Sequence, residues 1–122
     1  MPATVRATPD ADPCSRTDAA LTRAFAILGK RWNALVLGGL RCGPAGFREL
    51  SRAIDGLSDS VLADRLAELT RHHLVHRRVD EGPPVSVSYE LTEHGRALMP
   101  ALDQISAWAV DHLPPEPPAP RC

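Results

Sequence analysis

The chain has 122 residues, enough for one domain with a core of its own. The chain has 14 Lys and Arg residues and 15 Asp and Glu residues, so its net charge gives no support to nucleic-acid binding and any DNA affinity must come from locally placed cations. Three cysteines at unrelated spacings fit neither a disulfide framework nor a zinc site. The longest apolar stretch, near residues 34–37, is too short for a membrane span, so we expect a cytoplasmic protein without a membrane partner.

The two ends of the chain are predicted to be disordered. Residues 1–13 contain three prolines, residues 114–122 contain more, and neither segment has a periodic apolar pattern. One folded domain over residues 14–113 remains between them.

Two helices are predicted to begin this domain. Thr17 or Asp18 can cap the first helix, which ends at Gly29. Its apolar residues at helical spacing are Leu21, Phe25 and Leu28. The second helix is predicted over residues 31–41 and stops at Gly43-Pro44. Its expected inward residues are Trp32, Leu35, Val36 and Leu40.

The middle of the sequence predicts a helix-turn-helix. A helix of two turns over residues 47–54 carries Phe47, Leu50 and Ile54 at helical spacing. A break at residues 55–57 follows, and Ser58 is a suitable N-cap for a longer helix over residues 58–73. The expected buried residues of this longer helix are Leu62, Leu66 and Leu69. A short helix, a turn containing glycine and a longer helix make this motif.

After Leu74 the apolar period changes to two, which predicts a pair of strands. The alternating residues are Val75, Arg77 and Val79 in the first strand, and Val85, Val87 and Tyr89 in the second. The link over residues 80–84 is rich in turn-forming residues, so the strands are expected to pair as an antiparallel hairpin.

A final helix is predicted from Glu93, with Thr92 as its cap and Pro100 bending its early part. Its apolar stripe comprises Leu98, Leu102, Ile105, Ala109 and either His112 or Leu113. A domain of this size has little remaining core for so long a stripe to cover. Part of the stripe is therefore expected to meet a second copy of the chain.

A helix-turn-helix followed by a hairpin is the winged-helix arrangement, so the predicted fold class is α+β and mainly helical. In this arrangement the second helix enters the major groove of double-stranded DNA and the hairpin flanks it. The side chains expected to contact DNA from helix 58–73 and the first wing strand are Ser58, Ser60, Asp64, Arg65, Arg71, Arg77 and Arg78. Arginine can bind guanine or phosphate. A solvated helix surface, with Asp64, Arg65 and Glu68 paired locally, is the alternative interpretation.

Two acidic residues at the wing tip, Asp80 and Glu81, oppose a close approach to phosphate. We therefore expect the hairpin to be a weak clamp on the DNA backbone.

Metal and catalytic sites are not expected. His72, His73 and His76 are close in sequence, but the strand that begins near Leu74 breaks the helical geometry a shared metal would need. No nucleophile motif and no glycine-rich phosphate loop is present, so neither an enzyme nor a cofactor is predicted.

An ordered series of motifs over residues 14–113 resembles the HxlR family of transcriptional regulators, which are related to MarR-type proteins. The segments that carry the resemblance are Leu28-Gly29-Lys30-Arg31-Trp32, Gly43-Pro44, Phe47-Arg48-Glu49-Leu50, Leu57-Ser58, Val61-Leu62, Arg65-Leu66, Leu74-Val75, Arg77-Arg78, Val87-Ser88-Tyr89, Leu91-Thr92 and Gly95. The resemblance implies a dimeric winged-helix regulator whose first and last helices build the dimer. It also adds Lys30 and Arg48 to the expected DNA-binding residues.

The chain departs from the family pattern at two places. Members often have basic residues just before the Phe47 position and at the Ser60 position, whereas this chain has Ala45-Gly46 and a serine. Fewer phosphate contacts are therefore expected.

The resemblance also suggests a redox or electrophile sensor at Cys14, because some family members respond to oxidants or quinone-like electrophiles through a cysteine at the matching position. Arg16 and the positive end of the first helix favour the thiolate, whereas Asp12 and Asp18 oppose it. An inert cysteine beside a flexible arm is the alternative. We expect Cys42 to be buried and Cys122 to lie on a disordered tail.

We expect a homodimer that reads a pseudo-palindromic operator with half-sites about one helical turn apart. The alternative function is a winged helix that binds protein through the outer face of helix 58–73, which the acidic Asp59 and Asp64 would favour. Salt-sensitive binding to duplex DNA distinguishes the two.

Overall fold

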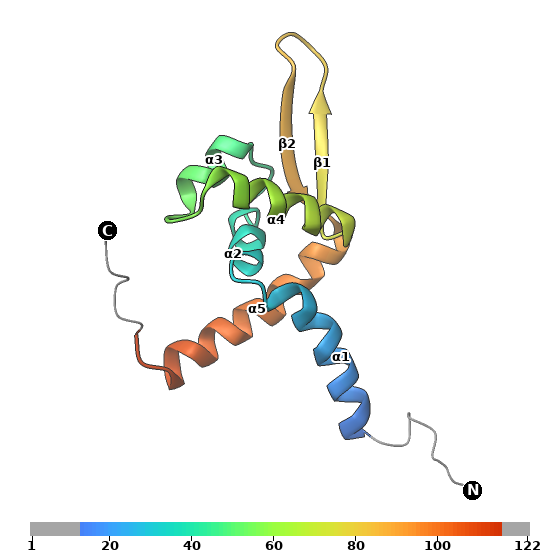
Figure 1. The fold of residues 1–122 in the computed structure, drawn as a ribbon, viewed down its shortest axis with the longest axis vertical. Coiled ribbons are helices and arrows are strands. Elements are labelled where there is room, and N and C mark those ends of the chain that lie inside the picture. The colour runs from blue at the N-terminus through green and yellow to red at the C-terminus, as the bar shows by residue number, and fades with distance from the viewer. Residues whose placement is uncertain (1–12, 116–122) are drawn as a thin grey trace, which may run out of the picture.

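The computed structural model describes residues 13–115, with side chains from Asp18 onward, and contains five helices and one two-stranded sheet (Figure 1). In chain order they are α1 (Pro13–Leu28), α2 (Asn33–Gly39), α3 (Phe47–Ala53), α4 (Asp59–Arg71), β1 (Val75–Asp80), β2 (Ser86–Leu91) and α5 (Glu93–His112). The predicted winged-helix order is confirmed. Residues 1–12 and 116–122, which make up most of the two segments predicted to be disordered, lie outside the described residues.

The first helix begins earlier than expected. It starts at Pro13, so neither Thr17 nor Asp18 is its cap, and Cys14 lies in its first turn instead of before it. Proline is well suited to this place, because its fixed φ suits a helix and its missing N–H would have no partner in the first turn.

The second helix is shorter than predicted, and one of its inward residues was assigned wrongly. Turns occupy residues 29–32, and α2 begins at Asn33. Leu35 is 54% exposed, whereas Asn33, Val36 and Leu37 are fully buried. Neighbouring helical positions differ by about 100°, so the face that packs on the core decides which leucine is buried.

The core lies where α2, α3, α4 and the base of the hairpin meet. Leu62, Leu66 and Leu69 of α4 are buried as predicted. The hairpin is antiparallel, with Val75 opposite Leu91 at its buried base, and it projects away from the helices (Figure 1). α4 is thus fixed on its inner side and has the wing beside it.

The predicted caps of α4 and α5 are confirmed. The Ser58 hydroxyl accepts a hydrogen bond from the backbone N–H of Val61 at 3.3 Å, and the Thr92 hydroxyl accepts one from Gly95 at 3.1 Å. Thr92 also donates to the carbonyl of His73 at 2.6 Å, which ties the end of α4 to the start of α5.

The two longest helices, α1 and α5, extend away from the wing (Figure 1). α5 continues through Pro100. Large apolar residues on these helices and just past the end of α5 remain exposed: Leu21, Phe25, Ile105, Trp108, Val110 and Leu113. Within residues 13–115, no helix combines the length and apolar character needed to cross a membrane.

Candidate nucleic-acid interface

The outer face of α4 is exposed along its whole length. Burial of Leu62, Leu66 and Leu69 against the core turns the opposite side of the helix to solvent. The exposed residues on that side are Ser60, Ala63, Asp64, Ala67 and Arg71. This is the face that the sequence predicted.

The hairpin supplies a second arginine next to this face. Arg77 of β1 and Arg71 of α4 line one cleft of 360 Å³, together with Ala63, Ala67 and Tyr89. Neither arginine forms an ion pair with residues 18–115. Both guanidinium groups are therefore free to meet a phosphate or a base edge.

Arg78 and the wing tip have local partners. Arg78 donates to Glu90 on the neighbouring strand at 3.4 Å and stays 59% exposed. At the tip, Asp80 accepts a hydrogen bond from the N–H of Gly82 at 3.1 Å, which orders the turn. Asp80 and Glu81 are exposed, so the tip presents negative charge.

Ser58, Ser60 and Arg48 lie at the N-terminal end of the motif. Ser58 is occupied as the α4 cap, and its hydroxyl lies 3.4 Å from that of Ser60. Arg48 is exposed in the first turn of α3.

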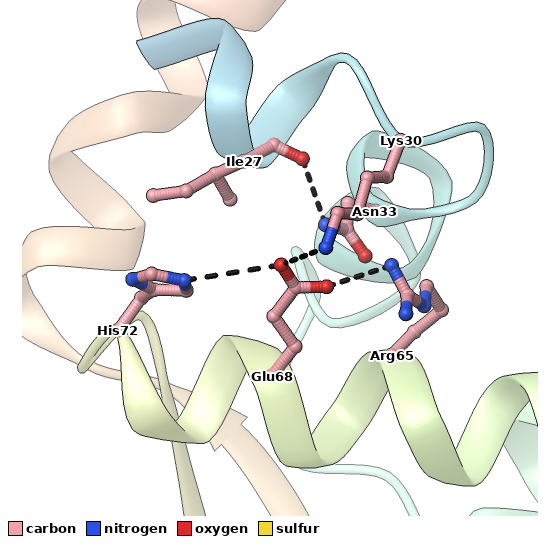
Figure 2. Close-up of polar contacts among 6 residues, drawn as sticks. All are labelled: Ile27, Lys30, Asn33, Arg65, Glu68 and His72. Atoms are coloured by element: carbon pink, nitrogen blue, oxygen red, sulfur yellow. Dashed lines mark hydrogen bonds and ion pairs between the residues drawn. The ribbon is translucent and has the colours of Figure 1, made fainter. Parts of the chain in front are cut away.

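Lys30 and Arg65 are directed to a common carboxylate, Glu68, instead of projecting freely (Figure 2). The Lys30 ammonium donates to Glu68 Oε2 at 2.7 Å, and Arg65 lies 2.7 Å from Oε1. The Glu68 side chain is only 5% exposed, whereas those of Lys30 and Arg65 are 50% and 20% exposed. The local pairing of Arg65 with Glu68, which the sequence offered as an alternative, is thus present.

The environment keeps Glu68 ionised. The hydrogen bond from Lys30 holds the pKa of the Glu68 carboxyl below its ordinary value, and the Asn33 side chain and the Arg65 charge act in the same direction. Burial opposes this shift but does not overcome it. Lys30 and Arg65 therefore face a permanent negative charge at neutral pH.

Sequence reasoning missed Asn33 and the central place of Glu68. Asn33 is fully buried and donates to the carbonyl of Ile27 at 2.7 Å, at the end of α1 (Figure 2). The three-residue spacing of Arg65 and Glu68 on one helix was visible in the sequence. The contact with Lys30, 38 residues away, had no local signal.

The three histidines have different backbone conformations, because α4 ends at Arg71 and β1 begins at Val75. His72 is the C-cap of α4, and its Nε2 lies 3.9 Å from Glu68. His73 has a left-handed backbone, and His76 lies in β1.

The prediction for Cys42 was wrong, because this cysteine is exposed. It follows the end of α2 in a turn before Pro44, where the chain leaves the core. The side chain of Cys14 lies outside the part that the structure describes.

A helix-turn-helix whose second helix is open to solvent and flanked by an arginine-bearing hairpin defines a winged-helix DNA-binding protein. The chain belongs to the HxlR family, since the family model described as HxlR-like helix-turn-helix matches residues 27–117. It is therefore a helix-turn-helix transcriptional regulator, and the expected family is confirmed.

The chain is similar to a regulator of Bacillus subtilis. The HTH-type transcriptional regulator YodB of strain 168 is 44% identical over 86 residues, which cover 70% of this chain and 77% of YodB. The reduced form of YodB matches with a TM-score of 0.73 at 40% identity, over 80% of this chain and 96% of that chain. The quinone-bound form matches with a TM-score of 0.67 at 39% identity, over 76% and 98%.

Proposed function

We propose that this regulator acts in the cytoplasm as a homodimer that reads a pseudo-palindromic operator, with α4 in the major groove and the hairpin on the phosphate backbone. The observation that carries this is the pairing of Arg71 and Arg77 across one cleft beside the exposed face of α4. Two such surfaces must be held about one helical turn apart to meet successive major grooves.

Within this surface each side chain has a proposed role. Ser60, Asp64 and Arg71 face the bases from α4, whereas Arg48, Arg77 and Arg78 contact phosphates from the flanks. Ser58 orders the first turn of α4 as its cap and offers its hydroxyl at the same edge. The side-chain contacts of Lys30 and Arg65 with Glu68 argue against a direct contact of either cation with DNA in the resting protein.

Footprinting and salt titration test this assignment together. A protected region with two-fold symmetry is expected. Replacing Arg77 with Ala removes one phosphate contact, so the slope of log Kobs against log salt should become shallower by about 0.9. Arg41→Ala is the matched control, because Arg41 pairs with Asp103 of α5 and does not line the cleft of Arg71 and Arg77. Asymmetric protection, or equal slopes for the two variants, would contradict the proposal.

The signal that we propose is an electrophile acting at Cys14. The relative YodB has been solved in a quinone-bound form, and Cys14 lies in the first turn of α1. The thiolate would add to a quinone ring carbon and form a carbon–sulfur bond. The electrons of the ring C=C bond would move to a carbonyl oxygen, which takes a proton from water, and transfer of the ring proton at the attacked carbon to the second oxygen would give the hydroquinone thioether. A displaced α1 would change the spacing of the two recognition helices and release DNA.

Operator binding before and after quinone treatment tests this role. The wild type and Cys42→Ser should lose binding, and Cys14→Ser should keep it. Cys42 is the appropriate comparison because its side chain is exposed and therefore open to the reagent. Loss of binding in Cys14→Ser, or retention in the wild type, would remove Cys14 from the mechanism.

A further inference from the structure

Two kinds of cation lie on or beside the recognition helix. Arg71 and Arg77 have no ion-pair partner among residues 18–115 and line the cleft between α4 and the wing. Lys30 and Arg65 are close to α4 as well, yet both are paired with the single carboxylate of Glu68. All four side chains belong to residue types that bind phosphate. The two kinds differ in whether a carboxylate pairs with them.

From this arrangement we infer that Glu68 is a specificity-determining residue, which withholds Lys30 and Arg65 from DNA phosphates and so limits the affinity of the protein for unrelated sequences. The inference rests on the proposed placement of α4 in the major groove. Phosphate contacts supply essentially all of non-specific binding, so removing two of them lowers affinity for every sequence without altering how bases are read.

The geometry makes Glu68 suited to this role. Its side chain is 5% exposed, so little water reaches the carboxylate to take the place of the two cations. Both of its oxygens are used, one by each cation, at 2.7 Å. The Lys30 side chain is nevertheless 50% exposed, and the Arg65 side chain is 20% exposed. Both cations are thus near the surface and would be available if the carboxylate were neutral.

The contacts of Glu68 also differ in strength. Lys30 makes a directed hydrogen bond, whereas Glu68 Oε1 accepts no hydrogen bond from residues 18–115 and meets Arg65 as an ion contact only. Arg65 is therefore the cation that should be released more easily when Glu68 loses its charge.

The test is the salt dependence of binding to an unrelated duplex, measured for the full chain. Glu68→Gln keeps the shape of the side chain and removes its charge. We expect the slope of log Kobs against log salt to become steeper by about 0.9 for each cation released, and thus by up to about 1.8. Adding Lys30→Met and Arg65→Met to Glu68→Gln should return the slope to the wild-type value.

Asp103→Asn is the matched control, because it also removes one negative charge and frees one arginine, Arg41, but on α5 and in the turn after α2. Its slope should equal that of the wild type. A role of Glu68 in folding alone would weaken binding without making the slope steeper. An unchanged slope in folded Glu68→Gln, or an equal change in Asp103→Asn, would overturn the inference while leaving the proposed interface intact.

A second measurement uses the unsubstituted protein and is independent of how the variants fold. The side-chain NMR signals of Lys30 and Arg65 should stay in place when an unrelated duplex is added, while those of Arg71 and Arg77 shift. Shifts of Lys30 and Arg65 equal to those of Arg71 would overturn the inference. If no duplex shifts the signals of any of these four side chains, both the proposed interface and this inference are wrong.

Discussion

His73 holds a backbone conformation that glycine adopts more readily. Its φ is 61°, in the left-handed region, directly after the C-cap of α4. The N–H of Leu74 returns to the carbonyl of Leu69 at 3.0 Å, so the left-handed residue closes the helix end in the manner of a Schellman motif. A side chain at such a position costs roughly 1–2 kcal/mol.

Replacing His73 with Gly should therefore raise the free energy of unfolding. We expect a gain of about 0.5–1 kcal/mol, because glycine relieves the left-handed strain but gives the unfolded chain more conformational entropy. Urea denaturation measures the change. His76→Gly in β1 serves as the control and should be destabilising, since glycine weakens strand interiors. A loss of stability in His73→Gly would contradict this account.

Glu68 should make folding sensitive to acid. Its pKa is lowered in the folded protein, chiefly by Lys30, with the Arg65 charge acting alongside, and His72 lies at 3.9 Å. A group with a lowered folded pKa contributes stability above its unfolded pKa, and this contribution is lost as the pH falls through the folded pKa. Lys30 and Arg65 remain charged throughout this range, so within the group of Lys30, Arg65 and Glu68 it is the carboxylate that changes.

We predict that stability falls between neutral and acid pH less steeply in Glu68→Gln than in the wild type. The variant should also lose about 1–3 kcal/mol at pH 7, the value of charge-assisted hydrogen bonds. Urea titrations at a series of pH values would measure both effects. Parallel pH profiles for the two proteins would exclude Glu68 as the titrating group.

At the level of elements, α5 meets the hairpin and the end of α4 at a glycine. Gly95 is buried in the first turn of α5, and a Cβ there would collide with the backbone carbonyl of Leu74 and press on Leu91. The close approach is what allows Thr92 to bond to both His73 and Gly95. Gly38 in α2 is different, because a Cβ there meets nothing within 4 Å.

The same substitution should therefore have opposite effects in the two helices. Gly95→Ala is expected to cost about 1–3 kcal/mol of stability, since the backbone of Leu74 must shift. Gly38→Ala should add up to about 1 kcal/mol, because alanine is the better helix former. Thermal unfolding of both variants measures these changes in stability. Stabilisation by Gly95→Ala would mean that α5 does not pack so closely on Leu74.

For the whole molecule, the unusual feature is apolar surface on the two long helices. Phe25 of α1 is 49% exposed, and Ile105 and Trp108 of α5 are 46% and 54% exposed. Patches of this kind on a small domain favour association with another protein surface. A second copy is the partner that the proposed function requires.

Placing a charge in this patch should separate the protomers. Ile105→Asp is expected to sediment as a monomer at micromolar concentration and to bind the operator far more weakly, since one recognition helix reads only half a site. Val79→Asp on the wing is the control for assembly, because Val79 is equally exposed, at 46%, but lies on the hairpin. A dimeric Ile105→Asp protein would place the interface elsewhere.

Local patterns in the sequence were sufficient to predict the order of the elements. The leucine period of α4, the alternation in β1 and β2, and the caps Ser58 and Thr92 are all confirmed. Each depends on bonds between residues a few positions apart, or on a face that must be buried whichever partner covers it. The exposed outer face of α4 follows from the same period.

Tertiary packing decided the features that depend on distant partners. It turned Leu37 inward and Leu35 outward on α2, and it left Cys42 in an exposed turn. It also brought Lys30 to Glu68 across 38 residues, so that one carboxylate pairs with both Lys30 and Arg65. Helical periodicity specifies which residues share a face, but only the packing of the turn between α1 and α2 against α4 determines which charges meet there.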